Sequence, residues 1–258
     1  MFTIATWFII VLPLIFPIGL PIDVSERTRE FYGYLQALKP GDIVIHNADT
    51  LVGTVEANII TFKYLIKNKI KWIGWAGTAA SAAYTEEALT KAGAFNNPNY
   101  QYGVDWVWLG YIPGEEAAHL GIRDSFQSFI TVDYKGTPSS QLPLLKGFRG
   151  DADCNMFIGT GESQIRWARI WPSRPGRPTL AIFPTDALGK IIPYYPQAFV
   201  GLLSGLQGAA ELEFLSGMPG QAISMNDAVS ASVLVLMAAT ILTQVVGLSK
   251  RTSKGVVK

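Results

Sequence analysis

Short apolar runs alternate with segments of helical spacing through the middle of this chain, and this alternation constrains the fold more than any other feature. Strand-like runs are predicted at residues 42–46, 70–75, 105–111, 129–133, 155–159 and 179–183. Helical spacing is found at residues 24–38, 50–68, 79–92 and 115–126. Strands that alternate with helices at this spacing are typical of βαβ units with right-handed crossovers. The sequence therefore predicts an α/β fold, with a mainly parallel, doubly wound, Rossmann-like sheet flanked by helices.

Uncharged apolar runs lie at both ends of the chain. Each has about the 20 residues that a helix needs to cross a bilayer. The first run contains three prolines, which kink or end a helix, and a cleaved signal peptide is the alternative for it. That run has no basic start and no small-residue cleavage site before Asp23, which favours a retained anchor. We expect membrane helices at residues 1–22 and 227–249, with one extramembrane domain at 23–226.

The charges beside these runs predict the orientation of the chain in the cell membrane. The tail at residues 250–258 carries four lysine or arginine residues, and basic segments next to a span tend to stay in the cytoplasm. Two spans then place the domain outside the cytoplasm. Arg27, Arg29 and Lys39 on the domain side favour the opposite orientation. Because the tail is the denser basic segment, we expect a cytoplasmic tail and an extracytoplasmic domain.

Charge and composition exclude several functional classes. The net charge of +1 gives no electrostatic basis for binding nucleic acid. Cys154 is the single cysteine, and His46 and His119 are the only histidines, so the sequence predicts no metal site. Neither glycine-rich nucleotide-binding fingerprint is present, and we expect no cofactor. The expected partners are the lipid bilayer and protein subunits.

Small polar residues follow the predicted strands, and the clearest example is Gly159-Thr160-Gly161. In doubly wound sheets, ligands bind outside the carboxyl ends of the strands. The alternative is that these residues only form turns and helix caps. If the edge binds a ligand, the candidate residues are Asp49, Thr50, Asp133, Gly159, Thr160, Gly161 and Glu162.

Two catalytic arrangements at the same edge are weaker hypotheses. Asp133 and Glu162 are candidates for an acid/base carboxylate pair, or else are a loop residue and a helix-start acid. Ser163 lacks the nucleophile-elbow pattern, and His46 is the only histidine predicted near it. The sequence predicts no catalytic residue.

Glycines recur at three- and four-residue spacing in the segment 197–217, which we predict as one helix. Each glycine inside a helix costs about 1 kcal/mol relative to alanine. A helix that keeps several glycines is therefore expected to allow close approach of another backbone. We predict that Gly201, Gly205 and Gly208 line an assembly face, against the sheet or a neighbouring subunit.

Five segments give this chain a resemblance to a known group of proteins. They are residues 102–105, 109–114, 133–138, 142–143 and 201–211. In sequence and order they are similar to a family of hypothetical prokaryotic membrane-anchored proteins, with an N-terminal span, an α/β domain, a Gly-rich helix and a C-terminal span. The resemblance covers residues 30–245 and implies no activity.

Two positions depart from that family's pattern. The turn after the first strand reads His46-Asn47-Ala48-Asp49, where the family has a more acidic turn with a serine. Leu212 stands where the family tends to have tyrosine. If relatives bind a ligand at the first turn, this departure puts that role in doubt here.

Two functions are compatible with these observations. The first is a structural or scaffolding subunit that assembles, as a homo-oligomer or with other membrane subunits, through its α/β domain and Gly-rich helix. The second is a membrane-tethered enzyme or small-ligand sensor that uses the carboxyl edge of the sheet. The absence of a catalytic pattern favours the first hypothesis.

Overall fold

The computed structural model describes residues 11, 13–14 and 19–255. The chain divides into two units, and residues 22–220 form the larger one. The second unit comprises residues up to 21 and from 221 onward. The predicted N-terminal membrane helix at 1–22 falls mostly outside the described residues, so it stays a prediction.

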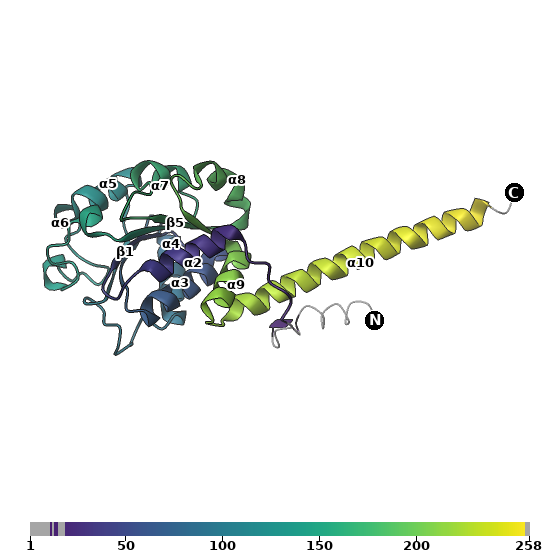
Figure 1. The fold of residues 1–258 in the computed structure, drawn as a ribbon, viewed down its shortest axis with the longest axis horizontal. Coiled ribbons are helices and arrows are strands. Elements are labelled where there is room, and N and C mark those ends of the chain that lie inside the picture. The colour runs from purple at the N-terminus through teal and green to yellow at the C-terminus, as the bar shows by residue number, and fades with distance from the viewer. Residues whose placement is uncertain (1–10, 12, 15–18, 256–258) are drawn as a thin grey trace. The chain divides into compact units, whose positions relative to one another are not determined.

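A six-stranded parallel sheet forms the centre of the larger unit, with the strand order β3-β2-β1-β4-β5-β6 (Figure 1). The chain runs outward from β1 to β3, then returns to place β4 beside β1. This confirms the predicted parallel α/β fold. The strands are β1 (Ile43–Ala48), β2 (Lys71–Ala76), β3 (Trp106–Tyr111), β4 (Met156–Thr160), β5 (Thr179–Phe183) and β6 (Gly201–Ser204).

Helices cover both faces of this sheet. One face carries α2 (Glu26–Ala37), α3 (Val55–Lys67), α4 (Ala79–Lys91) and α9 (Gly205–Ser216) (Figure 1). The opposite face carries α5 (Glu116–Asp124), α6 (Phe126–Phe129), α7 (Gln164–Ile170) and α8 (Leu188–Ile191). Short 3-10 turns lie at Val52–Thr54, Ser139–Gln141, Gly150–Asp153, Thr185–Ala187 and Ile192–Tyr194.

Local hydrogen bonds explain where two of these helices begin. The Ser25 side chain accepts from the backbone N–H of Thr28 at the start of α2. Thr78 caps α4 by accepting from the Ser81 N–H. Each cap satisfies a backbone donor that has no partner within its helix, which is why serine and threonine are favoured at this position.

Tryptophan rings fill the core on both faces of the sheet. Trp72 and Trp108 stack with their ring centroids 5.9 Å apart on the face of α3 and α4. On the opposite face, the Trp171 ring stacks on Phe157 at 4.4 Å. Gly74 makes room for Trp72, because a Cβ atom there would lie 2.1 Å from the indole ring. The aromatic residues of the strands are therefore core residues.

The segment 197–217 does not form the single helix that glycine spacing predicted. Residues 201–204 form β6, which pairs with β5, and only residues 205–216 are helical. A Cβ atom on Gly201 would lie 2.6 Å from the Cα atom of Phe31 in α2. The close approach is thus between a strand and a helix of the same domain, and the one-helix prediction is wrong.

The predicted strand at residues 129–133 is also absent. Its first residue ends α6, and only an isolated bridge between Val132 and Pro138 follows. The apolar side chains of this segment pack beside the end of β3 instead of joining the sheet. Ile130 is buried, whereas Phe129 and Val132 are 38% and 48% exposed, so the apolar residues are grouped here without a ladder of backbone hydrogen bonds.

Helix α10 (Gln221–Gly255) belongs to the second unit. Its portion Gln221–Val245 is long and apolar enough to cross a membrane, and no other helix among the described residues is. Leu234, Leu236 and Ile241 are all more than half exposed on it. In the same unit, the N–H of Gly19 donates to the Asp227 carboxylate at 2.9 Å. The structure thus supports one membrane-spanning candidate, at the C-terminal end.

Candidate functional site

The parallel strands bring their carboxyl ends to one edge, where the strand order reverses between β1 and β4. In sheets of this kind the crevice at the reversal is the usual ligand position. Here Asp49 follows β1, and its side chain accepts from the N–H of Gly77, which follows β2, at 2.5 Å. A Cβ atom on Gly161 would lie 2.7 Å from the Asp49 carbonyl oxygen. The ends of β1, β2 and β4 are therefore packed against one another through Asp49.

Burial raises the pKa of the Asp49 carboxyl above its usual value. The hydrogen bond from Gly77, the nearby Asn47 amide and the charge of Arg166 oppose this effect. The carboxylate also lies at the start of α4, where unpaired N–H groups favour a negative charge. Asp49 thus places a carboxylate of the chain itself at this edge.

Thr50 and Thr160, two of the predicted ligand residues, lie in a buried chain of hydrogen bonds behind this edge. His46 Nε2 lies 2.8 Å from the Thr160 hydroxyl, which donates to Asn58 Oδ1 at 3.1 Å. The Asn58 amide donates to the Thr50 hydroxyl at 3.0 Å. Thr50 in turn lies 2.7 Å from the Thr85 hydroxyl. The structure therefore places both threonines in the core.

His46 is held neutral in this network. The Trp72 indole can only donate, so His46 Nδ1 accepts from it at 3.2 Å and Nε2 carries the proton. Burial lowers the pKa of His46 to about 3. His119 is similar, because Nδ1 accepts from the Trp171 indole at 3.0 Å, and burial, followed by the charge of Arg166, lowers its pKa to about 3. Both histidines serve as buried acceptors.

The absence of a side chain at Gly159 leaves space for the Trp167 ring, and its absence at Gly161 leaves space for Asp49 in the turn after β1. A Cβ atom on Gly159 would lie 2.5 Å from the Trp167 ring. The Trp167 indole donates to Asn47 Oδ1 at 2.8 Å. The Gly159-Thr160-Gly161 motif thus packs α7 and the turn of β1 against the end of β4.

Glu162 lines a hollow of about 560 Å³ beside β4, and we call it the ion-pair hollow. Lys190 Nζ lies 4.0 Å from the Glu162 carboxylate. Ion pairs also join Arg166 to Glu115 at 2.8 Å and Arg169 to Glu116 at 3.2 Å. Because each cation here has a carboxylate partner, the charges largely cancel.

The Ser163 hydroxyl also lines the ion-pair hollow and accepts from Arg166 Nη1 at 3.2 Å. His46 is engaged with Thr160 and Trp72 and is fully buried. His46 is therefore not available to activate Ser163, and the suggested pairing of Ser163 with His46 is wrong.

Asp133 closes a tight turn. Its Oδ1 accepts from the N–H groups of Lys135 and Thr137 at 2.9 and 2.7 Å, and its Oδ2 accepts from the Tyr102 hydroxyl at 2.6 Å. Burial, and then this hydrogen bond, raise the pKa of Tyr102. Asp133 lines a different hollow from Glu162, so the suggested carboxylate pair does not form.

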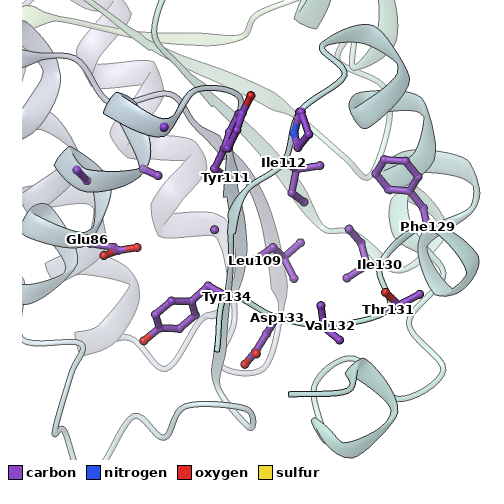
Figure 2. A pocket seen from close by; sticks show the side chains of 15 residues that line it. Glu86, Leu109, Tyr111, Ile112, Phe129, Ile130, Thr131, Val132, Asp133 and Tyr134 are labelled. Carbon is purple, nitrogen blue, oxygen red and sulfur yellow. The ribbon is translucent and has the colours of Figure 1, made fainter. Parts of the chain in front are cut away.

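A hollow of about 840 Å³ lies at the carboxyl end of β3. We call it the β3 pocket. Three segments line it: α4 from Ala79 to Glu86, residues 109–113 at the end of β3, and residues 129–134. Figure 2 shows Glu86 on one side and Phe129 on the other, with Tyr111 and Tyr134 between them. Its volume is in the range of ligand sites, about 300–1,000 Å³.

The polar groups of the β3 pocket are few and well placed. Glu86 Oε1 accepts from the Trp108 indole at 3.0 Å, which holds the carboxylate at the pocket wall. Glu86 and Asp133 are the only charged residues in the lining. Neither forms an ion pair with a described residue. Burial, and then the charges of Glu86 and Asp133, raise the pKa of Tyr134.

Sequence reasoning missed this pocket, apart from Asp133. Glu86 and Tyr134 belong to segments that meet only in the folded protein. One local signal was present: a glycine inside a strand pattern indicates a bulge or a close approach. Gly110 has φ +78°, and a Cβ atom there would lie 3.0 Å from the Tyr134 Cβ. Gly110 thus lets residues 133–134 approach the end of β3.

Within the residues that the structure describes, no three histidine, cysteine, aspartate or glutamate side chains are grouped to hold a metal ion. Comparisons of the chain with protein-family models, with curated proteins and with solved structures find no match.

Proposed function

We propose that this chain is a membrane-tethered ligand-binding protein that takes a small molecule into the β3 pocket. The pocket itself carries the proposal. It lies at the carboxyl edge of a parallel sheet, has the volume of a small-molecule site, and combines apolar walls with a few polar groups. Helix α10 supplies the tether.

The apolar surface around the pocket supports binding. Tyr111, Phe129 and Val132 line it and are 49%, 38% and 48% exposed. Apolar side chains grouped at a concave surface mark binding sites more often than scattered ones do. The switch-point edge between β1 and β4 is a poorer candidate, because the Asp49 backbone packs closely against Gly161 there.

Small aromatic probes test this proposal on the full chain in lipid nanodiscs. Benzyl alcohol, benzylammonium and benzoate are titrated separately and followed by ligand-observed NMR, with empty nanodiscs as the control for partition into lipid. Ala83 is an exposed position of α4 in the pocket lining, so Ala83→Phe fills the pocket without disturbing the core. Ala80 is exposed on the same helix outside the lining.

At least one probe is expected to bind the native chain and Ala80→Phe, and to lose binding in Ala83→Phe. Equal binding in both phenylalanine variants, or no binding of any probe to the native chain, would contradict the proposal. Melting temperatures of both variants verify that they fold.

Assembly as a scaffolding subunit is the second candidate function. The glycines first assigned to it have neighbours within the domain, but α10 offers a different surface. Ala239, Thr243 and Gly247 follow one another at four-residue spacing, which favours close packing of membrane helices. Light scattering of the detergent-solubilised chain is expected to give an oligomer that Gly247→Leu weakens. A monomeric native chain would contradict this candidate.

A further inference from the structure

We infer that the β3 pocket selects a small organic cation, such as an amine with an apolar or aromatic body. This inference rests on the proposed function and names the ligand class of the same site. It follows from the charges, the aromatic rings and the apolar lining of the pocket.

The charge of the lining is entirely negative. Glu86 and Asp133 come from opposite ends of the lining in sequence, and no lysine, arginine or histidine joins them. The ion-pair hollow at the same sheet edge differs, since it contains Arg166, Arg169 and Lys190. An anionic ligand in the β3 pocket would meet two carboxylates and no cation, whereas a cation would gain from both.

Both carboxylates are held in position by neutral donors, and neither is in an ion pair with a residue that the structure describes. Asp133 accepts from two backbone N–H groups and the Tyr102 hydroxyl. Glu86 accepts from the Trp108 indole. Hydrogen bonds from neutral donors stabilise a carboxylate without removing its net charge. Burial is the main cause of the raised pKa of Tyr134, and the charges of Glu86 and Asp133 add to it.

Aromatic rings supply the second attraction for a cation. Tyr111, Tyr134 and Phe129 line the pocket, and a cation over an aromatic face is attracted by the ring quadrupole (Figure 2). The protein already makes such contacts nearby: Lys135 Nζ lies 4.4 Å from the Tyr102 ring centroid and 5.5 Å from that of Tyr134. Lys135 is outside the pocket lining but its ammonium group lies near the Tyr134 ring, so Tyr111 and Phe129 are the rings that a ligand cation would use without competing with it.

Benzylammonium and benzyl alcohol separate charge from shape, because they have nearly the same size and differ in charge at pH 7. We expect benzylammonium to bind the native full chain in nanodiscs about tenfold more tightly than benzyl alcohol. Benzoate is expected to bind least. The preference for the cation should shrink as NaCl rises, because salt screens the carboxylates.

Glu86→Gln tests the role of the carboxylate. The glutamine side chain keeps an oxygen that can accept from Trp108, so the fold is retained while the charge is lost. The matched control is Glu87→Gln on the same helix, since Glu87 is outside the lining and pairs with Lys91 at 2.7 Å. We expect Glu86→Gln to reduce the tenfold preference to about twofold, and Glu87→Gln to keep it.

The outcomes distinguish this inference from the function on which it rests. If benzyl alcohol or benzoate binds as well as benzylammonium, and Ala83→Phe still abolishes binding, the pocket binds ligands but the cation inference is wrong. A preference that Glu86→Gln and Glu87→Gln reduce equally would also overturn it. If no probe binds, the inference and the proposed function both fail.

Discussion

Gly161 has a backbone φ of +116°, and a Cβ atom there would clash with the Asp49 carbonyl oxygen at 2.7 Å. Two physical requirements therefore meet at one residue. The backbone conformation is rarely adopted by residues with side chains, and the turn of β1 leaves no space for a methyl group. At this scale the glycine-rich motif has a packing role that accounts for it without a ligand.

Gly161→Ala is expected to destabilise the domain by about 2–4 kcal/mol, from overpacking added to the backbone cost. Gly176→Ala is the matched control. Gly176 has φ +79°, with nothing within 4 Å of an added Cβ atom, so it carries the backbone cost alone. Denaturant unfolding followed by tryptophan fluorescence measures both. Equal losses in the two variants would mean that the contact with Asp49 contributes nothing.

The buried histidines predict how stability depends on pH. His46 and His119 have folded-state pKa values of about 3, below the ordinary value of 6.5. Between these values the unfolded chain binds more protons than the folded chain, so stability is complete above pH 6.5 and is lost as the pH falls. Asp49 opposes this trend at lower pH, because its folded-state pKa is raised.

Lowering the pH from 7 to 5 is expected to cost up to about 2 kcal/mol per histidine. His46→Gln should remove one of these contributions, although it lowers stability at pH 7 by disturbing the Thr160 contact. Unfolding curves at pH 7, 6 and 5 measure the slope for each protein. An unchanged slope in His46→Gln would show that this histidine titrates normally.

At the scale of elements, α2 and β6 approach unusually closely. Gly201 in β6 lies against Phe31, and an added Cβ atom would be 2.6 and 2.7 Å from the Phe31 Cα and N atoms. The neighbours are backbone atoms, which cannot move aside as a flexible side chain can. The absence of a side chain at Gly201 thus allows α2 to pack closely against β6.

We expect Gly201→Ala to destabilise the domain by about 1–3 kcal/mol through overpacking. Gly189→Ala in α8 is the control, because a Cβ atom there meets nothing within 4 Å. Because glycine inside a helix costs up to about 1 kcal/mol relative to alanine, that variant is expected to leave stability unchanged or to raise it by up to about 1 kcal/mol. Light scattering on both should show unchanged assembly. Loss of an oligomer in Gly201→Ala without loss of stability would instead place this glycine at a subunit interface.

The whole molecule combines the α/β domain with a C-terminal helix that is suited to a bilayer. Cys154 is the only cysteine and is buried, so single introduced cysteines can report on their surroundings. Leu236 and Val52 are 66% and 74% exposed, the first on α10 and the second on the domain. If α10 spans the membrane, these two positions differ in reactivity despite similar exposure, because lipid excludes the thiolate and the reagent.

In sealed cells we expect a membrane-impermeant maleimide to label Val52→Cys and to leave Leu236→Cys unmodified until the protein is denatured. The native chain gives the background from Cys154. Rapid labelling of Leu236→Cys in native membranes would mean that α10 is in water. Labelling of Val52→Cys only after cells are opened would place the domain in the cytoplasm, opposite to the expected orientation.

Features that depend on local sequence patterns could be predicted from the sequence, whereas features that depend on contacts between distant segments could not. Alternating periodicity along the chain determined the strands and helices, and the predicted strand 179–183 agrees with β5 residue for residue. Parallel strand direction followed, because a helix between two strands returns the chain to the same edge. Helix α10 was equally readable, since its composition alone makes it long and apolar enough to span a membrane.

Only the tertiary structure decided what the polar strand ends contact. Thr160 contacts Asn58, and Asp49 contacts Gly77, through bonds between segments that no local pattern relates. Residues 201–204 became a strand because β5 offered a free edge and α2 covered them, despite helical glycine spacing. The β3 pocket arises where three segments distant in sequence meet, so its apolar walls and its two carboxylates come together only in the folded chain.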